Sequence, residues 1–204
     1  MQARSTALLL IGYQNDYFAS DGVLHGVVEA SLKANDVLGN TLRLIESVQE
    51  TDVKVISTPI RFTDDYSEIV EPVGILGTIR DAGAFRASSK GGAVIDEIVA
   101  FGDRITEVPG KRGLNAFSNT DLEELLRRNG ITDVAIAGVV TSLCIDSTAR
   151  HAFEAGFRVH VVSDCTSGRT QVEQSFYCDE VFPLYSRVVD SKSLVTDLST
   201  VEVV

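Results

Sequence analysis

The sequence predicts a single α/β domain of three layers (α/β/α), with helices on both faces of a Rossmann-like, largely parallel sheet of about six strands. Two observations lead to this fold class. Short apolar runs alternate with stretches whose apolar residues recur at helical spacing, which is typical of a parallel sheet. The 204 residues suit one domain spanning 1–204, and no internal repeat, low-complexity segment or linker divides them.

The elements are expected in alternating order. The run Thr6–Gly12 is continuously apolar, as expected of a strand covered on both faces, and Val27–Val48 has helical spacing. Further strands are expected at 53–58, 104–108, 134–140, 158–163 and 186–189. Further helices are expected near 73–79, at 93–101, 121–128, 143–153 and 171–182, and the tail is a poor helix.

Composition excludes several classes of protein. The net charge is −11, which argues against a nucleic-acid or anionic-membrane surface, because binding to phosphates needs clustered Lys and Arg. The three cysteines, Cys144, Cys165 and Cys178, lack the spacing of a disulfide framework or a structural zinc site. The apolar run Ala7–Ile11 is only strand-sized, so we expect neither a signal peptide nor a membrane span, and a cytoplasmic location.

Cys144 lies where the strand 134–140 gives way to a helix. The N–H groups and dipole of a helix N-terminus favour a thiolate, although an ordinary buried cysteine is the alternative. The stretch Gly12–Asp16, the Lys111 loop and the turn at Asp164 also follow strands. Because the carboxyl ends of parallel strands meet at one edge of a sheet, we expect a site there.

Three motifs stand in order along the chain: Leu10-Ile-Gly-Tyr-Gln-Asn-Asp16, Lys111 with Asn115-Ala-Phe117, and Gly138-Val-Val-Thr-Ser-Leu-Cys144 with Thr148-Ala149. Their order and spacing resemble those of the isochorismatase-like cysteine hydrolases, which include nicotinamidases, N-carbamoylsarcosine amidohydrolases and ureidoacrylate amidohydrolases. The resemblance covers nearly the whole chain and implies the same α/β fold.

The resemblance also implies roles for individual residues. Cys144 would be the nucleophile and Lys111 the cation that supports it. The backbone N–H groups of Val140 and Cys144 would form an oxyanion hole, helped by a cis Val139–Val140 peptide. A cation beside sulfur and donors aimed at an oxyanion suit this chemistry. For Lys111 alone, a solvated loop lysine is the alternative.

The family's catalytic aspartate falls at position 12, which is Gly12 here. We predict Asp16 as the replacement, provided the chain folds back after Gly12, since four extended residues span about 13 Å. A turn or cap role is the alternative for Asp16. Tyr13, Asp64, Asp65 and a base supplied by the substrate are the remaining candidates.

Four residues are expected to contact a small-molecule substrate. Gly12 would let a ligand approach the backbone closely. Arg61 follows the second strand and is either a partner for an anionic substrate or a surface arginine. Tyr13 and Val140 complete the set. Some family members hold a metal near the second strand, but His25, His151 and His160 do not cluster here, so we expect no metal and no cofactor.

Together these observations predict a cysteine-dependent hydrolase of a small-molecule amide, ureido or related C–N bond, acting through a thioester-type intermediate. One alternative is a catalytically impaired relative that acts as a small-molecule binding or scaffold protein. Another is a thiol redox or transferase activity of Cys144 with Cys165. The resemblance implies a homo-oligomer, a dimer or tetramer, and the aromatic residues between Phe176 and Tyr185 are a candidate interface or part of the core.

Overall fold

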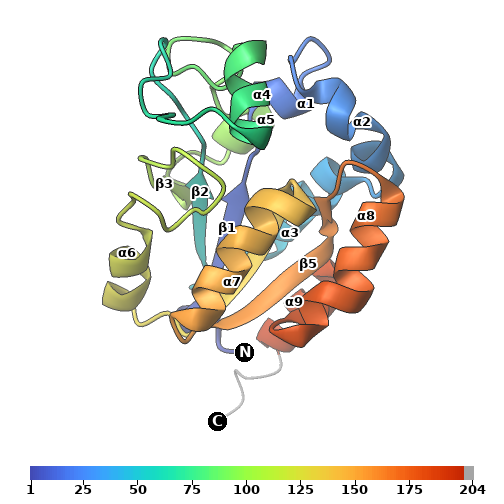
Figure 1. The fold of residues 1–204 in the computed structure, drawn as a ribbon. Coiled ribbons are helices and arrows are strands. Elements are labelled where there is room, and N and C mark those ends of the chain that lie inside the picture. The colour runs from blue at the N-terminus through green and yellow to red at the C-terminus, as the bar shows by residue number, and fades with distance from the viewer. Residues whose placement is uncertain (200–204) are drawn as a thin grey trace.

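The sheet of the computed structural model, which describes residues 1–199, has six strands within that range (Figure 1). They are β1 (Thr6–Ile11), β2 (Lys54–Thr58), β3 (Ile105–Glu107), β4 (Asp133–Val139), β5 (Arg158–Ser167) and β6 (Arg187–Val189). Their order is β3-β2-β1-β4-β5-β6, and every neighbouring pair is parallel. The predicted three-layer α/β fold is confirmed.

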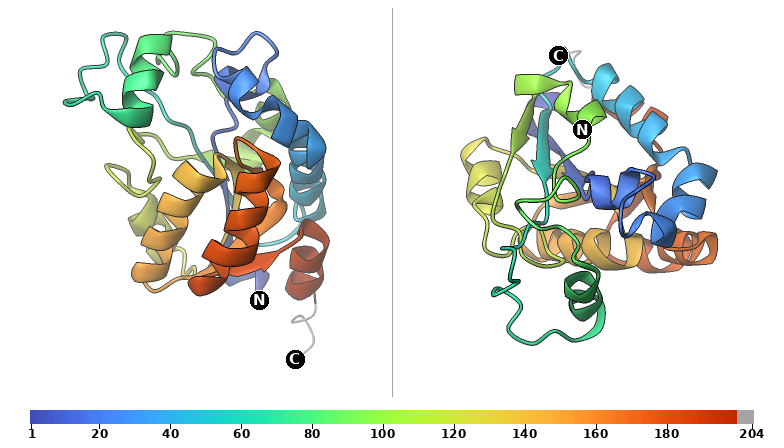
Figure 2. Two further views of the ribbon diagram at one scale, coloured as in Figure 1. Left: turned by 45° about the vertical axis from the view of Figure 1, so that its right-hand side comes forward. Right: turned by 90° about the horizontal axis from the view of Figure 1, so that it is seen from above.

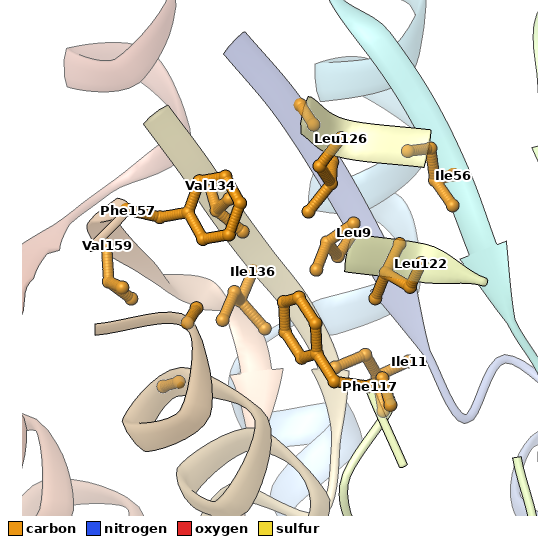
Figure 3. Close-up of a cluster of buried hydrophobic side chains, with 14 of the residues drawn as sticks. Leu9, Ile11, Ile56, Phe117, Leu122, Leu126, Val134, Ile136, Phe157 and Val159 are labelled. Atoms are coloured by element: carbon orange, nitrogen blue, oxygen red, sulfur yellow. The ribbon is translucent and has the colours of Figure 1, made fainter. Parts of the chain in front are cut away.

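The central strands β1 and β4 are buried along their whole length, because helices cover both faces of the sheet. On one face lie α6 (Leu122–Arg128) and α7 (Asp146–Glu154). Figure 3 shows the cluster beneath them, with Phe117 near Ile11, Leu122 near Leu9 and Phe157 near Val134. Cys144 belongs to this cluster.

The opposite face is covered by α3 (Val37–Ser47), α5 (Asp96–Val99) and α9 (Ser191–Ser199). Leu44 and Leu194 pack there against Leu8 and Leu10 of β1. Cys165 and the ring of Tyr13 lie in this second cluster. The sheet therefore separates Cys165 from Cys144.

A third cluster lies beyond the carboxyl ends of the strands, where α1 (Asn15–Phe18), α2 (His25–Ala34) and α4 (Gly74–Ala82) gather at the top of Figure 1. Much of it comes from residues 60–93, here called the excursion, which leaves the sheet after β2 (Figure 2). Phe62 and Phe85 of the excursion pack with Tyr17, Val139 and Val140. This cluster forms one wall of the site edge.

Several expected boundaries were wrong. The helix predicted for Val27–Val48 is two helices, α2 and α3, because Asp36 adopts a left-handed conformation (φ 46°) between them. Strand β5 continues through the predicted turn at Asp164, with a register shift against β4 between Ile136 and Gly138. The helix at 93–101 shrinks to α5. The helix predicted at 171–182 is present, as α8 (Gln171–Phe176) continued by a π-helical turn over 177–181 and a 3-10 turn that begins at Phe182.

None of the helices within residues 1–199 is both long and apolar enough to cross a membrane.

Candidate active site

The site centres on two buried side chains, Cys144 and Lys111. Cys144 lies in a π-helical turn (Thr141–Ile145) directly after β4, and Lys111 lies in the loop after β3. The lysine is 1% exposed and its Nζ donates a hydrogen bond to the Cys144 Sγ at 3.5 Å. Among residues 1–199, no carboxylate pairs with this ammonium group. Since a buried charge needs a partner, the Cys144 sulfur is the one side-chain group within residues 1–199 placed to balance Lys111.

The turn before Cys144 is set by the close approach of β4 to β1. Gly138 has a φ of 125°, and a Cβ there would stand 1.8 Å from the carbonyl oxygen of Ile11. The cis Val139–Val140 peptide that the resemblance implied is present. The Val140 carbonyl then accepts hydrogen bonds from the N–H groups of Leu143 (3.0 Å) and Ile145 (3.2 Å). These bonds close the turn that carries the sulfur.

Helix α8 braces this turn from the side. Thr141 Oγ1 donates to the buried Gln174 Oε1 at 2.5 Å, and Gln174 Nε2 donates to Thr166 Oγ1 at 3.0 Å. Ser142 Oγ donates to the Glu173 carboxylate. Sequence reasoning missed Gln174, because a glutamine in a predicted helix gives no signal until its position under the cysteine turn is known.

Arg61 is not free to anchor a substrate, contrary to the prediction. Its guanidinium forms two hydrogen bonds with the Glu107 carboxylate, at 2.5 and 3.1 Å, and its Nε donates to the Gly92 carbonyl. Its backbone N–H donates to the Lys111 carbonyl at 3.2 Å. Arg61 therefore helps to hold the Lys111 loop beside the excursion.

Gly12 meets its surroundings too closely for a side chain. Its φ is 74°, and a Cβ there would stand 2.8 Å from the Val139 carbonyl oxygen and 3.0 Å from Val139 Cγ2. Glycine is the residue that tolerates both conditions. An acid at this position would require a shift of the backbone beside the cysteine turn.

The Gln14-Asn15-Asp16 run binds the excursion rather than the sulfur. The Gln14 side-chain amide accepts a hydrogen bond from the Ile60 N–H at 2.9 Å and donates one to the Ile60 carbonyl at 2.8 Å. Asp16 Oδ2 accepts the N–H of Phe85 at 2.6 Å. Within residues 1–199, Lys111 is the only hydrogen-bond partner of the Cys144 sulfur. The predicted contact of Asp16 with the sulfur is therefore absent from these residues, because its carboxylate faces the excursion backbone.

The other acids that the sequence suggested are on the surface. Asp64 accepts a hydrogen bond from Ser88 Oγ, and Asp65 accepts hydrogen bonds from Thr63 Oγ1 and the Ser67 N–H. Both side chains are exposed, and all of these hydrogen bonds stay within the excursion.

Two tyrosines near the end of β1 point to different parts of the molecule. The Tyr13 hydroxyl lies 2.6 Å from Thr41 Oγ1 and donates to the Cys165 carbonyl, so the predicted substrate contact of Tyr13 is replaced by core packing. Tyr17 instead packs with Val139 and Val140 in the third cluster. Burial, followed by the negative charges of Cys144 and Asp16, raises the pKa of Tyr17. Sequence reasoning missed Tyr17.

The remaining two cysteines lie in environments that disfavour a thiolate. Burial, followed by the charge of Asp179, raises the pKa of Cys178 to about 11. Burial raises the pKa of the fully buried Cys165 still further, with the Asp164 charge as the second cause. Since Cys165 and Cys144 pack on opposite faces of the sheet, redox pairing of these two thiols has no structural support.

The residues near β2 do not fit the metal site that some family members hold. Ile60 and Phe62 are apolar residues buried after this strand. The histidines have separate partners, since His25 contacts Glu29, His151 contacts Asn115 and His160 contacts Asp133. Within residues 1–199, no three His, Cys, Asp or Glu side chains gather as a metal site would require.

The fold is an open parallel sheet with a buried cysteine–lysine pair beyond the carboxyl ends of its strands, the edge where sites of α/β proteins lie. The model of the isochorismatase domain matches residues 6–193, and the chain belongs to this family of hydrolases.

Two curated relatives and one solved structure illustrate the similarity. Nicotinamidase 3 of Arabidopsis thaliana is 29% identical over 165 residues, which are 81% of this chain and 74% of that protein. A probable inactive nicotinamidase of the same plant is 29% identical over 82% of this chain and 83% of its own length. The crystal structure of a cysteine hydrolase from Pseudomonas syringae has a TM-score of 0.80 at 17% identity, covering 98% of this chain and 95% of that one. That structure supports the fold alone.

Proposed function

We propose that this protein is a cysteine-dependent hydrolase of a small-molecule amide, ureido or related C–N bond, with Cys144 as the nucleophile. One observation carries the proposal: the Lys111 ammonium is buried 3.5 Å from a buried thiol, with no carboxylate among residues 1–199 to neutralise it. A structural cysteine has no need of such a cation, whereas a thiolate nucleophile does.

The proposed reaction begins when the Cys144 thiolate attacks the carbonyl carbon. A C–S bond forms, and the electron pair of the C=O bond moves onto oxygen, where the backbone N–H groups of Val140 and Cys144 are the expected donors. The tetrahedral intermediate then collapses and the C–N bond breaks. The carbonyl group remains on sulfur as a thioester, or as its carbamoyl counterpart for a ureido substrate.

The proton must be carried by a group at the sulfur, and Lys111 is the residue so placed. Its ammonium gives a proton to the departing nitrogen, so the amine leaves neutral. Water then attacks the carbonyl carbon and gives a proton to the Lys111 amine. The C–S bond breaks, and the thiolate and ammonium are restored beside a carboxylic or carbamic acid. Lys111 thus combines the charge support and the proton transfer that acid–base catalysis requires.

The proposal is tested by trapping the covalent intermediate. The protein is incubated with a panel of small amides, ureido compounds and a p-nitrophenyl ester, quenched in acid and digested, and the acyl group is located by mass spectrometry. We expect an acyl group on the Cys144 peptide, its loss in Cys144→Ala, and its retention in the control Cys178→Ala. Absence of both turnover and adduct across the panel would overturn the proposal.

A binding or scaffold role is the second candidate, and a specific observation favours it. Gly12 excludes the family's acid, and no carboxylate within residues 1–199 replaces it at the sulfur. A compound that raises the melting temperature but leaves Cys144 unmodified and is itself unchanged would support this role. Turnover of that compound would exclude it.

A further inference from the structure

We propose that the hydroxyl of Tyr17 takes over the place of the family's acid as a neutral hydrogen-bond donor to the carbonyl oxygen of the species bound on Cys144. The inference rests on the proposed function, and it adds a catalytic residue that is not an acid. It follows from the position of the Tyr17 ring, from the absence of a protein partner for its hydroxyl within residues 1–199, and from the charged groups nearby.

The ring of Tyr17 lies beside the space that a side chain at position 12 would enter. A Cβ added to Gly12 would stand 3.6 Å from Tyr17 Cδ2, so a side chain at position 12 would be in van der Waals contact with the Tyr17 ring. The ring also packs with Val139 and Val140, the two residues of the cis peptide, and lies 5.1 Å from the Phe85 ring. Tyr17 is therefore built into the wall beside the cysteine turn.

The hydroxyl of Tyr17 has no partner within residues 1–199, although the residue is only 5% exposed. The His25 ring contacts the backbone carbonyl of Tyr17, not its hydroxyl. By contrast, the more deeply buried Tyr13 has two partners for its hydroxyl. The Tyr17 hydroxyl is not among the fully buried polar atoms that lack a partner within residues 1–199, so it is a free donor open to a ligand or water at the site edge.

The charges around Tyr17 decide what its hydroxyl can do. Under the proposed function, the charged groups near Tyr17 are the Cys144 thiolate, with Lys111 beside it, and the Asp16 carboxylate. Burial and then these two negative groups oppose formation of a phenolate, so Tyr17 keeps its proton and can donate it in a hydrogen bond. Such a donor favours a carbonyl oxygen that gains negative charge during attack on it.

The experiment uses the full protein and propionaldehyde, a probe that adds to a thiolate and places negative charge on its carbonyl oxygen. The aldehyde is titrated against the rate at which iodoacetamide labels Cys144, and the protection gives a dissociation constant. Wild type is compared with Tyr17→Phe and with the matched control Tyr13→Phe. Thermal unfolding of each variant is recorded in parallel.

Loss of one hydrogen bond predicts that Tyr17→Phe weakens aldehyde binding about fivefold to tenfold, while Tyr13→Phe stays within about twofold of wild type. The melting temperatures should show the reverse order, because only Tyr13→Phe breaks hydrogen bonds present in the resting protein. A structural role for Tyr17 would lower both stability and affinity.

The outcomes separate the two proposals. Equal aldehyde affinity in wild type and Tyr17→Phe overturns the role of Tyr17 and leaves Cys144 as the nucleophile. An equal loss in Tyr17→Phe and Tyr13→Phe also overturns it, since the effect is then not specific to the site. If wild-type Cys144 is neither protected by aldehyde nor labelled faster than Cys178, both proposals fall.

Discussion

Strands β1 and β4 pair in register as far as Ile11 and Gly138, yet the segments that follow them do different work. After β4 the chain tightens at once into the turn that places Cys144 against Lys111. After β1 it turns at Gly12 and uses its next polar side chains to bind the excursion backbone. One strand end carries the cysteine proposed as the nucleophile, and its neighbour builds the wall beside it.

The difference lies in how each buried polar group is satisfied. Asp16 is buried and accepts a backbone N–H at 2.6 Å, so its charge has a structural use. Lys111 is buried and has only the sulfur of Cys144 as its side-chain partner within residues 1–199. A buried lysine whose partner is a cysteine sulfur is stronger evidence of catalysis than an acid at a strand end.

The largest expected effect concerns the three thiols. At pH 7.5 we expect iodoacetamide to label Cys144 at least about a hundredfold faster than Cys178, because a thiolate is the reacting form. The pKa of Cys178 is about 11, so its labelling should rise steadily as the pH increases toward 11. Peptide mapping of labelled protein across pH 6 to 10 measures both rates. If Cys178 or Cys165 is labelled faster than Cys144 near neutral pH, the assignment of Cys144 as the nucleophile is wrong.

Removing the cation should have the next largest effect. Lys111→Met keeps an unbranched side chain in the buried space but leaves the thiolate without its partner. We expect labelling of Cys144 at pH 7.5 to slow by about tenfold to a hundredfold, the range for loss of an opposite charge at contact distance. Lys90→Met, at an exposed lysine in the excursion, is the matched control and should leave the rate unchanged. An unchanged rate in Lys111→Met would remove Lys111 from the site.

The two strand ends also differ in what the sequence revealed. Cys144, Lys111 and the cis peptide lie within the motifs that carry the family resemblance, so the resemblance implied that they lie together, and the structure shows the contact and the cis bond. Which tyrosine packs beside the cysteine turn depends on the left-handed conformation of Gly12, and the sequence does not give the φ of a glycine. Tyr13 was therefore expected at the site and Tyr17 was overlooked.

Some predicted helix and strand boundaries were wrong for a related reason. The break between α2 and α3 occurs at Asp36, whose positive φ no local pattern demanded. The extension of β5 through Asp164 depends on a shifted register with β4. Both are consequences of tertiary packing. The fully buried strands β1 and β4 are instead predicted directly by continuous apolar runs in the sequence. The homo-oligomer and the cytoplasmic location stay predictions.

A third test probes how tightly the two strand ends pack. Gly12→Ala places a Cβ 2.8 Å from the Val139 carbonyl in a left-handed conformation, which should lower the free energy of unfolding by roughly 1–3 kcal/mol. Gly26→Ala is the control, because a Cβ there meets nothing within 4 Å. Urea denaturation measures both. A neutral Gly12→Ala would show that the backbone can yield, and Gly12→Asp would then become a direct way to restore the acid.

The smallest expected effect decides between the two uses of Asp16. Asp16→Asn keeps an acceptor for the Phe85 N–H but removes its charge, so we expect a loss of about 1 kcal/mol in unfolding free energy. Labelling of Cys144 at pH 7.5 should stay within about twofold of wild type, because the carboxylate serves the excursion backbone. Asp64→Asn, at an exposed acid bonded to Ser88, controls for the change in net charge. A large change in the labelling of Cys144 by Asp16→Asn alone would return Asp16 to the role of proton acceptor and end the contrast between the two strand ends.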